Sequence, residues 1–417
     1  MNYMLGSCKP LSILVARFSL LLFVIISVPT AHAYAQRTLS VPETSIERQT
    51  EGIVSVDMDV IGDENTIGFS VTFNTTQFTF VSVAPSPTLP AGTTVLTNEL
   101  QKENGRVGIA VSLPFGTSFA PGKHRLVDIR LAALTTGNSL AVVGFGDQPI
   151  PREFVRADAS NIPTSAVTLT PGTIVIFAKA TSASAASYST IAFAPQSIVA
   201  VFGAGLATDI AVAGSIPLPT SLAGTTIKFV DSALVSKNAP LFFVSPGQCN
   251  YLIPDGVASG AATITVTSAD GRISIGNVFI APVAPGFFSA NVSGTGVAAA
   301  QIYRIRGQTQ LIEEVASYQP GPNAFIANPI DFGPAEDLLV LVLYGTGLRF
   351  NSGTGGVTVT IGGTAVSVLY ANAAPGYVGL DQVNVGVLPR SLAGRGVVDI
   401  VVKVDGFEAN TLTMQFK

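Results

Sequence analysis

The chain has 417 residues, of which 47% are apolar and only 12% are charged, and its net charge is −4. Globular domains carry about a quarter charged residues, so this surface must consist largely of Ser, Thr, Asn, Gln and Gly. The acidic balance and the lack of any basic cluster argue against a nucleic-acid partner. The even spread of apolar residues argues against disorder, and the length allows roughly two to four domains.

The first 35 residues are typical of a secretory signal peptide. Lys9 and Arg17 supply the positive charge, residues 18–28 form the apolar core, and small residues at 31–33 or 33–35 supply the cleavage site. An uncleaved membrane anchor is the alternative, but the apolar run of about eleven residues is too short to cross a bilayer. We therefore expect a secreted protein whose mature chain has no transmembrane span and a net charge of −6.

Apolar and polar residues alternate with a period of two through residues 38–177. Such runs predict strands with one buried and one wet face, and they lie at 54–60, 67–73, 107–113 and 127–131. Clusters of turn-forming residues separate the runs, at 62–65, 103–105, 121–122 and 136–138. Because no helical period survives for two turns, the pattern predicts an all-β sandwich.

The order of these elements carries a resemblance. The strand at 68–74 leads into a second at 78–83, and the segments at 105–111, 126–131, 144–147 and 172–176 follow. This order resembles a cohesin domain, a β-sandwich of the cellulosome and carbohydrate-binding group, over residues 36–178. Where cohesins often have Tyr-Asp-Pro, this chain has Phe73-Asn74-Thr75. The resemblance implies a module that binds a protein partner.

Residues 179–189, KATSASAASYS, are small and polar and lack periodicity. This composition is typical of a flexible Ser-rich linker, so we expect a domain boundary here.

Two copies of one unit follow the predicted linker. APLFFVSPGQCNYLIP at 239–254 recurs, altered, as APGYVGLDQVNVGVLP at 374–389, and an apolar strand ending in Gly-x-Gly-Leu precedes each copy. Both copies contain Gln-x-Asn, as Gln248 and Asn250 and as Gln382 and Asn384. The repeat predicts two sandwiches, at 190–284 and 285–417.

The segments at 217–224, 242–250, 284–287 and 378–384 carry a second resemblance. Their order resembles immunoglobulin-like IPT/TIG modules, and specifically a paired C-terminal unit of secreted acidobacterial-type proteins of unknown function. The resemblance implies architecture and export, and no activity.

We first consider the repeated Gln-x-Asn pairs as a ligand site. Residues spaced by two share a strand face, and the pair recurs in a second sandwich with different surroundings. We therefore predict that each pair binds backbone groups where strand and loop meet, so that Asn250→Ala would lower stability and leave binding unchanged.

The mature chain offers few groups for catalysis. Its one histidine, His124, stands between Lys123 and Arg125, so we expect a solvated loop residue and no catalytic role. Cys249 is predicted to be a buried small hydrophobe, and the chain lacks the His and Cys clusters of a zinc site. We interpret Glu313-Glu314 as a solvated strand end and expect a non-catalytic protein without a cofactor.

Calcium and sugars are the remaining ligands to weigh. Asp57, Asp59, Asp63 and Glu64 form a weak calcium candidate, although an exposed polar face is the interpretation we favour. Sugar platforms present aromatics with a polar tip, yet the chain has no Trp and no Tyr between 35 and 187. A patch remains open in the C-terminal unit, which has Tyr251, Tyr344, Tyr370 and Tyr377.

The leading hypothesis is protein–protein recognition or adhesion at the cell exterior through the cohesin-like module. The alternative is a polysaccharide-binding module that supports extracellular polysaccharide breakdown, and an undetected hydrolase ranks last. Either binding function should use loops or one exposed sheet face.

Overall fold

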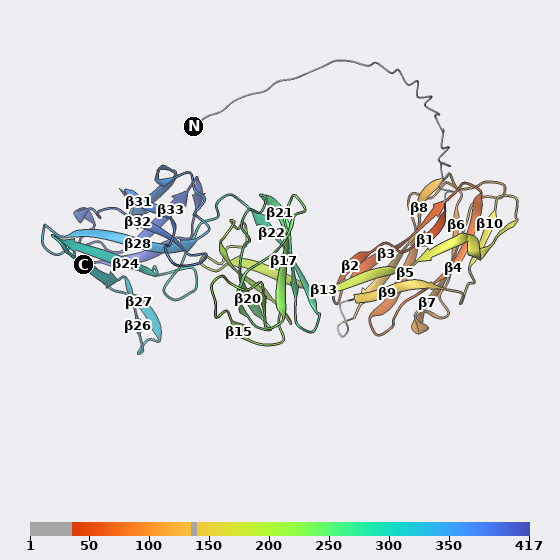
Figure 1. The fold of residues 1–417 in the computed structure, drawn as a ribbon, viewed down its shortest axis with the longest axis horizontal. Coiled ribbons are helices and arrows are strands. Elements are labelled where there is room, and N and C mark those ends of the chain that lie inside the picture. Colours follow the sequence, from red (N-terminus) through yellow and green to blue (C-terminus); the bar gives the residue numbers. More distant parts are fainter. Residues whose placement is uncertain (1–35, 135–139) are drawn as a thin grey trace, which may run out of the picture.

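The computed structural model describes residues 36–134 and 140–417, so the predicted signal peptide and the predicted turn at 136–138 lie outside the described residues. The described residues form 35 strands and four single-turn 3-10 helices, which confirms the predicted all-β class. No helix in these ranges is long and apolar enough to cross a membrane. The strands form three sandwiches that lie in a row (Figure 1). Each sandwich has its own hydrophobic core, formed by residues within 39–176, 180–280 and 283–416.

The first sandwich packs the sheet β12-β1-β3-β8-β5 against a second layer built around β4, β7 and β9. The alternation at 54–60 buries Val54, Val56 and Met58 completely, as predicted. Its elements are β1 (Arg37–Ser40), β2 (Thr44–Glu47), β3 (Glu51–Val60), β4 (Glu64–Thr72), β5 (Phe78–Pro85), β6 (Thr94–Asn98), η1 (Lys102–Asn104), β7 (Arg106–Ser112), β8 (Gly122–Ala133), β9 (Leu140–Gly146), β10 (Glu153–Arg156), β11 (Asn161–Ile162), η2 (Thr164–Ala166), β12 (Val167–Thr170) and β13 (Gly172–Ser184).

The prediction of a flexible linker at 179–189 is wrong, because β13 runs without a break from the first sandwich into the second (Figure 1). Its first half pairs with β9 and β2, and Ala178 and Lys179 pair with β22 (Ile273–Ile280). Residues 180–184 then pair with β14 (Ile198–Gly203). The small Ala and Ser side chains allow this strand to be buried, since Ala180 and Ala183 are at most 5% exposed.

The second sandwich packs the C-terminal part of β13 with β14, β20, β19 and β15 against a layer of β16, β17, β18, β21 and β22. Cys249 and Tyr251 on β20 are fully buried in its core, as predicted for Cys249, and burial raises the pKa of the thiol to about 11. The remaining elements are β15 (Ala211–Val212), β16 (Ser221–Leu222), β17 (Thr225–Val230), β18 (Ser236–Asn238), β19 (Leu241–Val244), β20 (Gln248–Leu252) and β21 (Gly260–Thr267).

The third sandwich packs the sheet β25-β24-β28-β32-β31 against a layer of β30, β29, β33, β34 and β35. A separate hairpin, β26–β27, projects from it (Figure 1). The elements are β23 (Gly286–Phe287), β24 (Ala300–Arg306), β25 (Thr309–Glu314), β26 (Ala316–Gln319), β27 (Ala324–Ala327), β28 (Leu338–Thr346), η3 (Thr354–Gly356), β29 (Val357–Ile361), β30 (Thr364–Val366), β31 (Val368–Ala373), β32 (Asp381–Val385), η4 (Arg390–Leu392), β33 (Gly396–Val404), β34 (Phe407–Glu408) and β35 (Leu412–Phe416).

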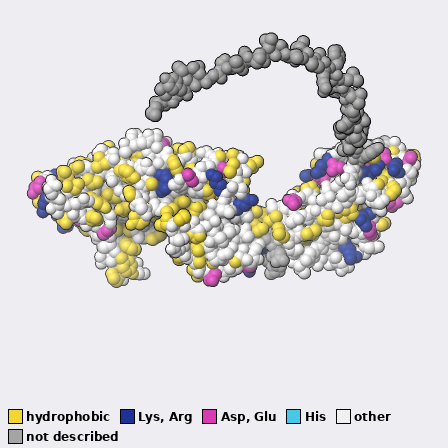
Figure 2. Space-filling model, in the orientation of Figure 1, with side chains coloured by type: hydrophobic (Ala, Val, Ile, Leu, Met, Phe, Trp, Pro, Cys, Tyr) yellow, Lys and Arg dark blue, Asp and Glu magenta, His cyan; other side chains and the backbone are white. Residues whose placement is uncertain are grey.

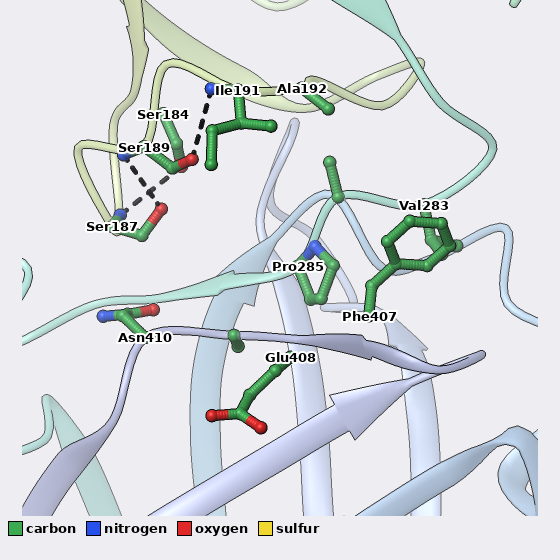
Figure 3. Close-up of a pocket in the computed structure, with 12 residues that line it drawn as sticks. Ser184, Ser187, Ser189, Ile191, Ala192, Val283, Pro285, Phe407, Glu408 and Asn410 are labelled. Atoms are coloured by element: carbon green, nitrogen blue, oxygen red, sulfur yellow. Dashed lines mark hydrogen bonds between the residues drawn. The ribbon is translucent and has the colours of Figure 1, made fainter.

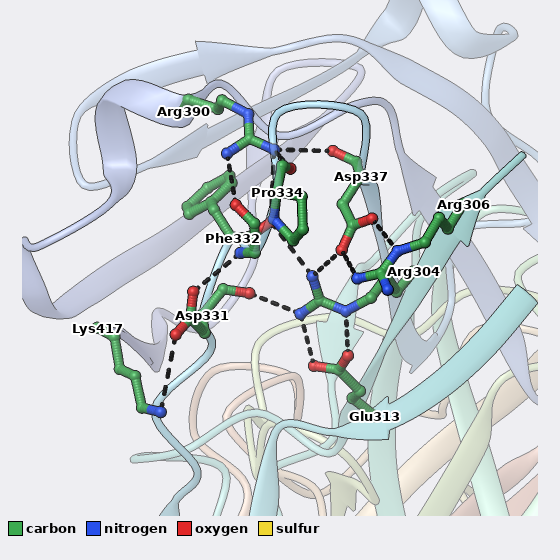
Figure 4. A network of polar contacts seen from close by, with 10 residues as sticks. Arg304, Arg306, Glu313, Asp331, Phe332, Pro334, Asp337, Arg390 and Lys417 are labelled. Atoms are coloured by element: carbon green, nitrogen blue, oxygen red, sulfur yellow. Dashed lines mark hydrogen bonds and ion pairs between the residues drawn. The ribbon is translucent and has the colours of Figure 1, made fainter.

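A buried ion-pair network centred on Arg304 holds one end of the third sandwich together (Figure 4). Arg304 binds Glu313 across the β24–β25 pair, and its Nη1 lies 2.9 Å from Asp337 Oδ2. Arg306 binds the same Asp337 carboxylate at 2.6 and 2.7 Å. Glu313 and Glu314 lie at the end of β25, as predicted, with Glu314 exposed and Glu313 half-buried in its ion pair with Arg304.

Because β13 is shared by the first and second sandwiches, a methyl group added where it meets β22 should lower the stability of the fold. A Cβ at Gly276 on β22 would lie 2.5 Å from the backbone oxygen of Ala180 on β13. Backbone atoms in paired strands cannot move aside, so Gly276→Ala should lower the free energy of unfolding by about 1–3 kcal/mol. Chemical denaturation of the wild type and the variant measures this difference.

Gly247→Ala is the matched control, because a Cβ at Gly247 would meet no atom within 4 Å. Equal stabilities for the two variants would contradict a tight contact between β13 and β22.

The Arg304 network predicts a pH dependence. Hydrogen bonds from Arg306, followed by those from Arg304, hold the pKa of Asp337 well below its ordinary value. A carboxyl whose pKa is lower in the folded state stabilises the fold above its unfolded pKa and loses this effect as the pH falls. Asp337→Asn should therefore melt below the wild type at neutral pH, and the gap should shrink below about pH 4. A gap that stays constant with pH would contradict the charge-based role.

Candidate functional site

The two outer faces of the first sandwich differ in how they are covered. On the β4–β7 face, residues 147–152 lie over the sheet, and the Ile150 backbone bonds Ser70 Oγ through both its N–H and its carbonyl, at 2.9 and 2.6 Å. A Cβ at Gly108 would lie 2.6 Å from the Ile150 side chain, so glycine is needed for this close approach. Hydrogen bonds from Arg152 fasten the segment at Asp147 and lower the pKa of that carboxyl to about 2.

The opposite outer face, on β3, β8 and β5, is open to solvent. We call it the open face, and it consists of the outward residues Glu51, Ile53, Ser55, Asp57, Asp59, Thr79, Val81, Ala84, Lys123, Arg125, Asp128 and Arg130. Cross-strand ion pairs connect its charges, with Lys123 at 3.1 Å from Asp57 and Arg130 at 3.5 Å from Glu51. Figure 2 shows charged side chains gathered over the first sandwich more densely than over the rest of the visible surface.

Two apolar side chains lie among these charges. Ile53 is 47% exposed and faces Arg130 across the strand pair, while Val81 is 40% exposed in the β5 bulge beside the same arginine. An apolar centre with a charged rim is the usual anatomy of a protein–protein interface.

The structure divides the four calcium candidates between two sites. Asp57 and Asp59 lie on β3, and Asp57 pairs with Lys123. Asp63 and Glu64 instead bind Arg37, whose Nη2 and Nε lie 2.7 Å from their oxygens. Glu64 also accepts the backbone N–H groups of residues 61–63, which makes it a structural anchor of that turn. Within the described ranges, no group of three or more His, Cys, Asp or Glu is placed to hold a metal ion.

His124 lies on strand β8 opposite Met58, so the prediction of a loop residue is wrong. Its Nε2 donates to the backbone oxygen of Ala120 at 2.7 Å, and its ring packs 5.3 Å from that of Phe119. The ring is thus engaged in local packing on the strand.

A cleft of about 330 Å³ lies between the second and third sandwiches (Figure 3). Ser184, Ser187 and Ser189 line one wall, and each of their hydroxyls accepts a backbone N–H within the same turn. Opposite them lies Glu408, which pairs with Lys403 at 2.9 Å. The residues that line this cleft include no histidine that could activate a serine.

The repeated Gln-x-Asn pairs occupy equivalent positions on β20 and β32. Gln248 Nε2 donates to Asn250 Oδ1 at 2.8 Å, and Gln382 Nε2 donates to Asn384 Oδ1 at 2.7 Å. The sequence interpretation expected bonds to the backbone, whereas these bonds join one side chain to the other. All four residues are half-buried on the outer face of their sheet, opposite the core.

Comparison with known proteins gives structural similarities only. No known family profile matches the chain, and no curated protein matches its sequence. One similar structure is the sixth cohesin from scaffoldin B of Acetivibrio cellulolyticus, solved with a dockerin: 15% identity, 34% of this chain and 99% of that chain, TM-score 0.29. A non-cellulosomal cohesin from Archaeoglobus fulgidus is similar over 34% of this chain and 93% of that chain, with 12% identity and TM-score 0.29. A cohesin module of a Clostridium perfringens family 33 glycoside hydrolase is similar over 34% and 95%, with 14% identity and TM-score 0.28.

Proposed function

We propose that this protein is a secreted, non-catalytic recognition or adhesion protein whose first sandwich binds a protein partner through the open face. One observation carries the proposal: the first sandwich leaves uncovered a sheet face with an apolar centre, Ile53 and Val81, and a rim of charges. Export is supported by the signal-peptide pattern at residues 1–35.

The chemistry of the open face favours a protein over a sugar. The face has no aromatic residue, so it has no platform on which a sugar ring could stack. Its arginine and lysine side chains, at 48–57% exposure, alternate with carboxylates across the strands. Charges in such a fixed pattern select partners by complementarity and speed their association. The partner should therefore present a surface with both charge signs around an apolar contact.

The proposal is tested with the chain of residues 36–417, because cutting at residue 178 would split β13. Immobilised protein is used to capture proteins from the secretome of the source culture, and each captured protein is quantified by mass spectrometry. Ile53→Asp or Arg130→Glu should reduce the retained amount of the specific partner by about tenfold or more, since central interface residues dominate binding.

Leu96→Asp on β6 is the matched control, because Leu96 is also an exposed strand residue, at 64%, but lies on the other layer. It should retain the partner like the wild type, with melting curves showing that all three variants fold. Equal retention by the Ile53→Asp and Leu96→Asp variants would contradict the proposal.

A further inference from the structure

The two C-terminal sandwiches share more than the Gln-x-Asn pair. In the second sandwich, Phe202 on β14 lies opposite Gln248, and Phe243 on β19 lies opposite Asn250. A β-bulge precedes Phe243, and it allows this side chain to face outward beside the pair. The outer sheet face thus presents an aromatic, two amides and an aromatic in one cluster.

The third sandwich repeats this cluster in the same register. Tyr344 on β28 lies opposite Gln382, and Tyr370 on β31 lies opposite Asn384 after a bulge at the same place. We call each group of four residues an aromatic–amide cluster. Directly opposed residues in an antiparallel pair have Cβ atoms about 5 Å apart, so each amide lies beside an aromatic ring.

Each amide pair is oriented internally and keeps groups free for a ligand. The bond from Gln382 Nε2 to Asn384 Oδ1 leaves Gln382 Oε1 and Asn384 Nδ2 without a hydrogen-bond partner among the described residues. The same bond in the second sandwich leaves Gln248 Oε1 and Asn250 Nδ2 in the same state. Each copy therefore keeps one amide oxygen and one amide NH2 group that are not used within the part of the protein that the structure describes.

The two clusters belong to adjoining surfaces. Ile198 and Leu252, on the same face as the first cluster, would contact a Cβ at Gly379 at 2.6 and 2.7 Å. Gly379 belongs to the β31–β32 loop that also carries Tyr377, which is 68% exposed. Thr346 Oγ1 joins both sides, since it accepts the Ile198 N–H and donates to the Gly379 carbonyl, at 2.9 and 2.8 Å.

The third sandwich enlarges its cluster with a cavity. A space of about 300 Å³ lies between Tyr344 and Phe325 of the β26–β27 hairpin, over a floor of alanines, with Gln301 and Glu314 at its side. Tyr344 Oη donates to Gln301 Oε1 at 3.1 Å, and Gln301 Nε2 donates to Glu314 at 2.8 Å. Figure 2 shows hydrophobic side chains over this hairpin and the neighbouring part of the third sandwich.

The near absence of charged residues on these two outer sheet faces indicates which class of ligand fits them. The outward positions of the two outer sheets contain one residue that is charged at neutral pH, Glu314. The strands considered are β13 from residue 181 onward, β14, β15, β19, β20, β24, β25, β28, β31 and β32. Aromatic faces with hydroxyl tips and planar amides match the apolar faces and hydroxyl groups of sugar rings. An anionic polymer would find no Lys, Arg or His at these outward positions, because Arg304 and Arg306 of β24 belong to the Asp337 network on the other side of that strand. A repeated cluster along one molecule fits a ligand that itself repeats.

We propose that the outer faces of the second and third sandwiches bind an uncharged polysaccharide chain through the two aromatic–amide clusters and Tyr377 between them. The third sandwich makes the stronger contact, because its aromatics carry hydroxyls and its cavity adds Gln301 and Phe325. This proposal is independent of the open face on the first sandwich.

The proposal is tested by pull-down of the chain of residues 36–417 on three insoluble neutral polymers: cellulose, chitin and β-1,3-glucan. Acidic pectin is included to compare binding to a charged polymer. We expect retention on at least one neutral polymer at both 0.1 and 1 M NaCl. Tyr344→Ala together with Tyr370→Ala should weaken that retention about tenfold or more, and Phe202→Ala should weaken it less.

Phe279→Ala is the matched control, because Phe279 is a 52% exposed aromatic on β22 of the opposite layer, and its retention should equal that of the wild type. Arg130→Glu on the open face should also leave glycan binding intact, so the two proposals can fail separately. Flow-through on all three neutral polymers, retention on pectin alone, or unchanged retention of the folded Tyr344→Ala, Tyr370→Ala variant would overturn the proposal.

Discussion

The pairing of β13 with strands of two different sandwiches is the constraint on which the rest of the molecule depends. One strand of 13 residues supplies hydrogen bonds to β9 and β2 at one end and to β14 at the other. Two domains joined by a linker reorient freely, whereas two that share a strand keep the geometry of its hydrogen bonds. The open face and the first aromatic–amide cluster therefore hold a fixed relation to each other.

The contact between the second and third sandwiches extends this rigidity by other means. Arg349 binds Asp381 at 2.7 Å and reaches across to Gln196 at 2.9 Å. Burial raises the pKa of Asp381, although Arg349 and two backbone N–H groups oppose the shift. A buried charge of this kind tolerates little movement, because a lost partner would leave it unpaired. The β31–β32 loop that carries Tyr377 is thus held between both clusters.

The sequence predicted the strands well where alternation was strong, and failed where side chains were small. At Val54, Val56 and Met58 the pattern was sufficient, because large apolar residues at every second position need a buried face. At residues 179–189 the same Ala and Ser composition suits a linker and a tightly packed strand equally. The difference comes from Gly276 on β22, whose missing side chain makes room for Ala180. No local pattern reveals a neighbour so distant in sequence.

The repeated motif shows the same limit for the candidate sites. Gln-x-Asn could be found twice from the sequence, but its aromatic partners lie on other strands and are Phe in one copy and Tyr in the other. Only the register brings Phe202 and Tyr344 to equivalent places. The second copy therefore does not argue against a ligand, because its surroundings match those of the first. The sequence also could not show which outer face of the first sandwich is the open one. That depends on tertiary contacts, because Ile150 covers the β4–β7 face.

Charged residues are distributed unequally between the two proposed binding surfaces. The open face is rich in paired ions, and the cluster faces contain almost none. Exposed ion pairs weaken with salt because the Debye length falls from about 10 Å at 0.1 M to about 3 Å at 1 M, whereas stacking and neutral hydrogen bonds do not depend on that screening. The proposed polysaccharide contact should therefore depend less on salt than the proposed protein contact. The open face and the two clusters lie on different sandwiches and share no residue, so each proposed site can be mutated without changing the other.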